Sequence, residues 1–284
     1  MAHAFRLKSQ GKSWKDVLTG LQARLPQDLR LRGEAPEKGS KLQRAPLVLA
    51  FREGLSTRGV ELLEGDGTLT LRLPGFPSRE DLTLGLQLVE LSAGLLGAQQ
   101  VETVDGPVAP TALFSDEVAA ALARAQSEEN DALNTAVLLG RTLELPGCLR
   151  PFFLGPRTYE SLRTTSTAQE GLWDKVVSAY RQVQWVHLHG IHPATVMGLR
   201  RGSSEFTAST WQPGKAHVFA PVDMVLVKAQ GEPLRLPWAA LPHVAADHFA
   251  WLDERQATVR GFTESEWPEV VSRAEAALGT RPAQ

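Results

Sequence analysis

Residues 78–97 read SREDLTLGLQLVELSAGLLG, and this segment constrains the fold more strongly than any other part of the chain. Ser78 is suited to cap the start of a helix, and Gly97 to end it, because Gly adopts the left-handed backbone that closes helices. The leucines and valines fall on two helical stripes, at 82, 86, 89 and 96 and at 84, 88, 91 and 95. A helix that is apolar on both sides is typically buried. We therefore expect a long buried helix near 78–96, at the centre of the fold.

The residues before this helix predict a β-hairpin. A Gly-Asp-Gly turn at 65–67 separates two strand-like runs, and in the second run Leu69, Leu71 and Leu73 alternate with polar residues. Along the chain, strand-like and helical patterns come in runs without strict alternation, which favours an α+β fold. The sequence thus predicts a mixed or mainly antiparallel sheet packed against helices.

The length of the chain and the positions of its Pro and Gly residues indicate the domain organisation. A chain of 284 residues is long enough to bury one large core or two smaller ones. The prediction is a single α+β domain over residues 1–284. The alternative is two lobes with a boundary near 145–157, where the sequence LPGCLRPFFLGPR is rich in Pro and Gly, as connections often are.

Composition excludes several classes of protein. A formal net charge of -2 provides no general attraction to nucleic acid or to anionic lipid. No apolar run approaches the roughly 20 residues that a membrane helix requires, and the first 14 residues lack the apolar core of a secretory signal. Cys148 is the single cysteine, which suits a reducing compartment. We expect a cytoplasmic protein without nucleic-acid or membrane partners.

The segment WVHLHGIHP, residues 185–193, raises the question of a metal site. His187 and His189 are two positions apart and would share one face of a strand. His192 follows the turn at Gly190, and His243 and Asp247 have the spacing of one helical face. Catalytic zinc needs three protein ligands and an open position. These five residues are the candidate metal ligands, and they define a metal-dependent hydrolase as one alternative function.

The interpretation favoured for this segment is a strand and its exit, without metal. Apolar residues surround the histidines, and the stretch holds no carboxylate of the kind that usually completes a catalytic metal site. The dinucleotide, phosphate-loop, zinc-protease and serine-hydrolase motifs are all missing from the sequence. Cys148 has no activating residue beside it. The sequence therefore predicts no catalytic residues and no cofactor.

Two charged segments are candidates for an interaction face. Residues 1–45 hold ten Lys or Arg against four Asp or Glu, and QSEENDA at 126–132, interpreted as a loop, is acidic. We predict a non-enzymatic binding protein, in its specific form an immunity protein that neutralises a bacterial toxin. Its partner would be that toxin or another neighbouring gene product. A structural or assembly subunit is the third alternative, and the sequence makes no prediction of oligomeric state.

Residues 55–96 resemble an uncharacterised bacterial family, domain of unknown function four-two-nine-nine. The resemblance is carried by an S-x-RG-[VF]-EL hairpin and a PS-[SR]-R-[ED]-D-like cap, here Ser56, Arg58, Gly59, Glu61 and Leu62, then Pro77, Ser78, Arg79 and Asp81. Residues 219–241 are similar in pattern to the closing strand and hairpin of that family. The resemblance implies an α+β fold of similar size and no known activity or cofactor. It also implies that the motif residues have cap and turn chemistry.

Overall fold

The computed structural model describes residues 3–8, 11–12, 14–24, 27–34, 47–165, 171–201 and 204–279. The chain forms two compact units. Unit 1 contains residues 1–152 and 159–184, and unit 2 contains residues 153–158 and 185–284. The single-domain organisation over residues 1–284 stays a prediction.

Unit 1 is built on a seven-stranded sheet with the order β2-β3-β4-β5-β1-β6-β7. All neighbouring strands are antiparallel. The strands are β1 (His3–Lys8), β2 (Leu29–Glu34), β3 (Leu47–Arg52), β4 (Val60–Gly65), β5 (Thr68–Leu73), β6 (Val101–Thr103) and β7 (Gly106–Val108). The predicted hairpin is confirmed as β4 and β5, which turn through Asp66 and Gly67 at positive φ. β2 pairs with β3 over its whole length, from Leu29 opposite Arg52 to Glu34 opposite Leu47.

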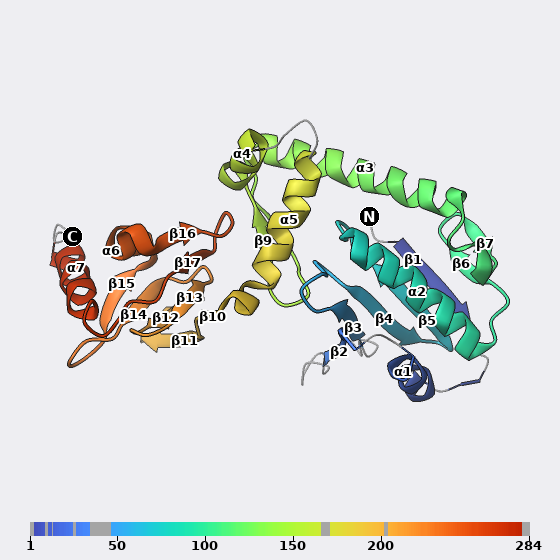
Figure 1. Cartoon of the computed structure of the whole chain (residues 1–284), viewed down its shortest axis with the longest axis horizontal. Helices are drawn as coiled ribbons and strands as arrows, with labels where there is room; N and C mark the ends of the chain where they lie inside the picture. The colour runs from blue at the N-terminus through green and yellow to red at the C-terminus, as the bar shows by residue number, and fades with distance from the viewer. Residues whose placement is uncertain are drawn as a thin grey trace. The chain divides into compact units, whose positions relative to one another are not determined.

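Helix α2 (Arg79–Leu96) lies across one face of this sheet (Figure 1) and confirms the predicted long buried helix. Ser78 is its N-cap, and Gly97 ends it at φ 70°. Its inner side, including Leu84, Leu88 and Val89, is fully buried in the core of unit 1. The other leucines of the two stripes, at 82, 86, 91 and 95, are partly buried, and Leu95 lies against Gly20 of α1 (Trp14–Gln22). The α+β class is confirmed.

The rest of unit 1 follows β7 along the chain. It comprises the 3₁₀ turn η1 (Pro110–Ala112), α3 (Asp116–Leu138), the strand pair β8 (Leu143–Leu145) and β9 (Phe152–Leu154), α4 (Pro156–Thr165) and α5 (Leu172–Gln184). β9 and α4 each contribute residues to both units. None of the helices in the described ranges is long and apolar enough to cross a membrane.

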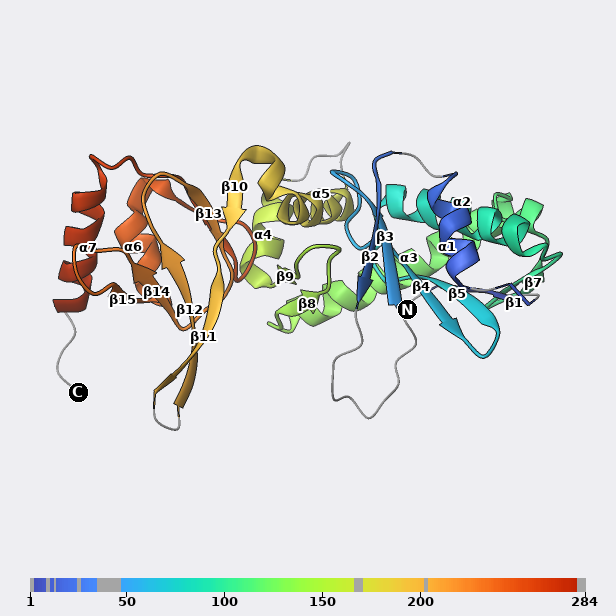
Figure 2. The same cartoon turned by 90° about the horizontal axis from the view of Figure 1, so that it is seen from below.

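Unit 2 contains two four-stranded sheets, with orders β10-β13-β17-β16 and β11-β12-β14-β15. The strands are β10 (Ile191–Pro193), β11 (Val196–Arg201), β12 (Ser204–Trp211), β13 (Ala216–Phe219), β14 (Met224–Val227), β15 (Leu234–Pro237), β16 (Phe249–Trp251) and β17 (Ala257–Val259). β10 with β13 and β12 with β14 are parallel, and the other pairs are antiparallel. β11 and β12 form the long hairpin in Figure 2.

The core of unit 2 is aromatic. Trp211 is 1% exposed and packs edge-on against Phe219, Phe262 and Trp267, with ring centroids 5.3 to 6.3 Å apart. Helices α6 (Leu241–Ala245) and α7 (Trp267–Gly279) contribute apolar residues to this core. The short 3₁₀ turns of unit 2 are η2 (Val186–His189), η3 (Trp238–Ala240) and η4 (Ala246–His248).

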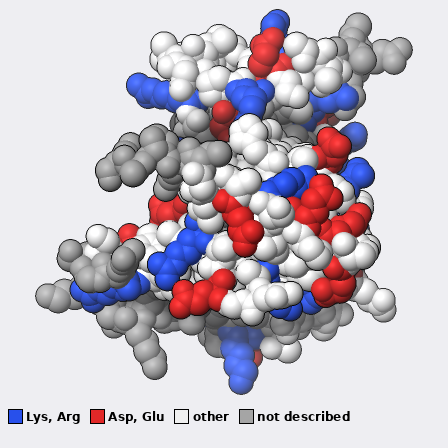
Figure 3. Space-filling view, turned by 90° about the vertical axis from the view of Figure 1, so that its left-hand side faces the viewer, with Lys and Arg blue, Asp and Glu red and all other residues white. Residues whose placement is uncertain are grey.

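On the side of the molecule turned toward the viewer in Figure 3, acidic and basic side chains are scattered among uncharged ones.

Candidate functional site

The histidine segment is not a strand where it was predicted to be one. Val186–His189 form the 3₁₀ turn η2, which ends at Gly190 in the left-handed conformation. A 3₁₀ helix has three residues per turn, so residues two apart project in different directions. His187 is half-buried beside Trp185, whereas His189 is exposed. The prediction that His187 and His189 share one face is therefore wrong.

The remaining metal candidates are also separated. His192 lies on β10, opposite His217 of β13. α6 ends at Ala245, and Ala246 takes φ 47° and ψ −125°, so His243 and Asp247 do not share a helical face. This break corrects the predicted helical spacing. Within the described ranges, no group of three or more His, Cys, Asp or Glu side chains is placed to hold a metal ion.

His217, on β13, is a buried imidazole outside the five predicted metal ligands. It is 7% exposed, and neither ring nitrogen has a hydrogen-bond partner of good geometry among the described residues. Burial lowers the pKa of His217, and the nearby His192 and Lys215 lower it further. Its neutral form is therefore favoured in the folded protein.

This shift predicts a loss of stability in mild acid. Because the folded-state pKa of His217 lies below its ordinary value of 6.5, the unfolded chain binds the proton more readily. The contribution is fully present above pH 6.5 and is lost as the pH falls toward the folded-state pKa. We expect urea unfolding to show a smaller difference between pH 7.5 and 5.5 for His217→Phe than for the wild type. His189→Gln, at an exposed position, is the control; equal pH dependence in all three proteins would contradict the prediction.

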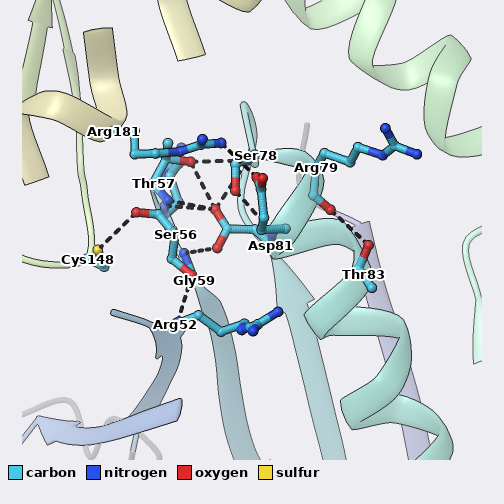
Figure 4. Close-up of polar contacts among 12 residues, drawn as sticks. Arg52, Ser56, Thr57, Gly59, Ser78, Arg79, Asp81, Thr83, Cys148 and Arg181 are labelled. Atoms are coloured by element: carbon cyan, nitrogen blue, oxygen red, sulfur yellow. Dashed lines mark hydrogen bonds and ion pairs between the residues drawn. The ribbon is translucent and has the colours of Figure 1, made fainter. Parts of the chain in front are cut away.

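Several residues that carry the family resemblance, among them Ser56, Gly59, Ser78 and Asp81, lie together at the start of α2 (Figure 4). Asp81 is fully buried. Its Oδ2 accepts hydrogen bonds from Thr57 N, Thr57 Oγ1, Arg58 N and Ser78 N at 2.9 to 3.2 Å, and its Oδ1 accepts one from Gly59 N at 3.1 Å. Ser78 Oγ in turn accepts from Asp81 N, which completes a capping box. Five donors hydrogen-bond to this carboxylate. Its role is therefore to hold the loop and the start of α2 in place.

Backbone conformation and hydrogen bonds together fix the loop at 56–59. Gly59 has φ +71°, and a Cβ there would lie 2.5 Å from the backbone oxygen of Ala50. Cys148 N donates to Thr57 O at 3.0 Å, and Arg181 pairs with Glu80 at 2.7 Å. The first contact connects the loop to the 145–150 segment, and the second connects α5 to the start of α2. The capping box confirms the cap roles inferred for Ser78 and Asp81.

Cys148 lies within this polar network but is unsuited to nucleophilic catalysis. Its side chain is fully buried, and its Sγ contacts Ser56 O and Gln184 Oε1 at 3.7 and 3.8 Å. Burial raises the pKa of the Cys148 thiol to about 12, and the nearby Asp81 carboxylate adds to the increase. The reactive thiolate is therefore scarce at neutral pH.

The acidic segment QSEENDA is the middle of a helix and not a loop. α3 continues without a break over its 23 residues, of which Leu122, Glu129, Leu133 and Val137 are buried. The side opposite this buried stripe, here called the outer face of α3, carries Glu117, Ala120, Arg124, Glu128, Asp131, Thr135 and Leu138, all exposed. These positions are spaced by three, four or seven residues, as on one helical face. α3 forms the upper edge of unit 1 in Figure 1.

The outer face of α3 combines charge with apolar surface. It carries three carboxylates, those of Glu117, Glu128 and Asp131, against the one guanidinium of Arg124. At its C-terminal end Leu138 and the adjoining Leu139 are 72% and 68% exposed. The basic N-terminal candidate is described only in part, since residues 35–46 lie outside the described ranges.

Comparison of the chain with protein-family models, with curated proteins and with solved structures finds no match. The class defined by the coordinates is α+β, and the resemblance to domain of unknown function four-two-nine-nine stays a prediction.

Proposed function

We propose that this protein is a non-enzymatic binding protein whose partner is a protein with a basic surface that docks on the outer face of α3. The observation that carries this proposal is the geometry of α3. A 23-residue helix extends about 35 Å, yet only four of its side chains are buried. Large apolar side chains such as Leu138 and Leu139 are usually covered when they lie together, and exposed apolar surface with a polar rim is typical of protein interfaces.

The charge on the outer face of α3 indicates which kind of partner surface it binds. The excess of carboxylates on the outer face of α3 favours a partner with Lys and Arg, because complementary charge accelerates association and disfavours acidic competitors. The specific form of the proposal is an immunity protein, in which the covered basic surface belongs to a bacterial toxin. The saturated Asp81 carboxylate and the protonated Cys148 thiol support a non-enzymatic role, since neither is available for proton transfer or nucleophilic attack.

The test combines capture with charge reversal. Untagged partner proteins from the native host are captured with the full chain and identified by mass spectrometry, and the affinity of the purified pair is then measured. We expect one stoichiometric, basic partner and a reduction in affinity of about tenfold or more for Glu128→Lys/Asp131→Lys. The wild-type affinity should also decrease as salt increases.

Glu90→Lys, an exposed position on α2, is the matched control and should bind like the wild type. Leu138→Ser tests the apolar end of the same face. A partner whose affinity is unchanged by the double charge reversal, or a chain recovered alone, would overturn the proposal.

A further inference from the structure

A hollow in unit 2 lies on one face of the sheet β10-β13-β17-β16. It has a volume of about 280 Å³ and is lined by Ile191, Ala216, His248, Ala250, Thr258 and Arg260, among others. We call it the Arg260 hollow.

Strand register explains why this face is hollow. Ile191 pairs with Ala216, and Ala250 pairs with Thr258. Alternate residues of a strand point to the same face, and two of the positions on this face carry only a methyl group. The intervening residue Val259 belongs to the buried aromatic core instead. Ala216 and Ala250 therefore leave space that larger side chains would fill.

A strained backbone holds one wall of the Arg260 hollow in place. Ala246 has φ 47° and ψ −125°, a conformation that residues with a Cβ rarely adopt. This turn directs the chain from α6 into Asp247 and His248, after which β16 begins. Such strain persists where the surrounding structure enforces it, and it is concentrated at ligand-binding sites.

The cationic group in the Arg260 hollow is unpaired. The Arg260 guanidinium is exposed and makes no hydrogen bond or ion pair with the described residues. His248 contributes to the wall of the hollow, but its Nδ1 is buried and therefore does not face it. The imidazole is oriented by stacking on Phe262, with centroids 4.0 Å apart and an interplanar angle of 17°. Donors without acceptors beside an apolar wall match a ligand that has a carboxylate at one end and an apolar body at the other.

We propose that the Arg260 hollow binds a small monocarboxylate with an apolar body. Arg260 pairs with the carboxylate through its planar fork. The apolar body lies against Ala216 and Ala250. Asp247 also lines the hollow, and its negative charge favours a singly charged carboxylate over phosphate. This inference goes beyond the proposed partner binding and does not depend on α3.

Benzoate is the probe, titrated into the full-length protein and followed by NMR chemical shifts. A ligand of this size should bind with a Kd on the order of 1 mM, with shifts centred on β16 and β17. Benzamide has the same shape without the charge and should bind at least about tenfold more weakly, as should benzoate to Arg260→Gln. Ala250→Leu, which fills the hollow, should abolish binding.

Arg79→Gln and Ala132→Leu change the same residue types at exposed positions of unit 1 and should leave benzoate binding intact. Thermal unfolding checks that each variant is folded, and Arg260→Gln tests the proposal separately should Ala250→Leu fail to fold. Equal binding of benzoate and benzamide, unchanged binding by Arg260→Gln, or no saturation up to about 20 mM would overturn the inference. Saturable binding of inorganic phosphate in preference to benzoate would overturn it as well.

Discussion

Asp81→Ala is expected to lower the free energy of unfolding by about 4 kcal/mol, a large share of the stability of an ordinary domain. The substitution removes the acceptor for Thr57, Arg58, Gly59 and Ser78 and leaves several buried N–H groups unpaired. Each such group costs about 1–3 kcal/mol, and relaxation of the loop recovers part of the sum. The measurement is urea unfolding followed by circular dichroism.

Glu90→Ala on the exposed side of the same helix is the control and should change the stability by less than about 0.5 kcal/mol. Ser78→Ala removes one cap and should cost about 1 kcal/mol. A loss below about 1 kcal/mol for Asp81→Ala would show that the five hydrogen bonds are replaced by water at little cost.

Trp211→Ala is expected to cost about 3–5 kcal/mol in unit 2, because the indole is almost completely buried at the centre of four packed aromatic rings. The structure around such a truncation relaxes only in part, so a cavity remains. Unfolding monitored by near-ultraviolet circular dichroism measures the effect.

Trp251→Ala is the matched control. Trp251 is 43% exposed and contacts the Arg157 guanidinium, 3.7 Å above the ring centroid, and the rings of Phe249 and Trp238. An exposed cation–π contact contributes about 0.5–1 kcal/mol. Similar losses for the two tryptophan substitutions would contradict the assignment of Trp211 to the centre of the core.

The Asp81 and Trp211 variants together test the domain prediction. Asp81 lies in unit 1 and Trp211 in unit 2. If the chain is one cooperative domain, both variants should shift a single unfolding transition. If each variant shifts a different transition, the two units fold separately and the single-domain prediction is wrong.

Features that depend on neighbouring residues were predictable from the sequence. The capped helix at 79–96 and the hairpin at 60–73 are set by Ser78, Gly97 and the Gly-Asp-Gly turn, whose conformational preferences act within a few residues. The loop interpretation of residues 126–132 is wrong because an acidic stretch resembles a loop. The lack of any Gly or Pro between residues 116 and 139 is the signal that favours one continuous helix.

Features that depend on pairing between distant residues required the structure. Asp81 was recognised as a cap residue, but its acceptance of hydrogen bonds from Thr57 and Gly59, more than twenty positions earlier, depends on how α2 lies on the sheet. The alternation of histidines at 187 and 189 is compatible with a strand, yet the chain turns there as η2 before pairing begins at Ile191. Short-range preferences differ by about 1 kcal/mol and are readily overridden by packing. The Arg260 hollow arises from the register of separate strands, which no single segment encodes.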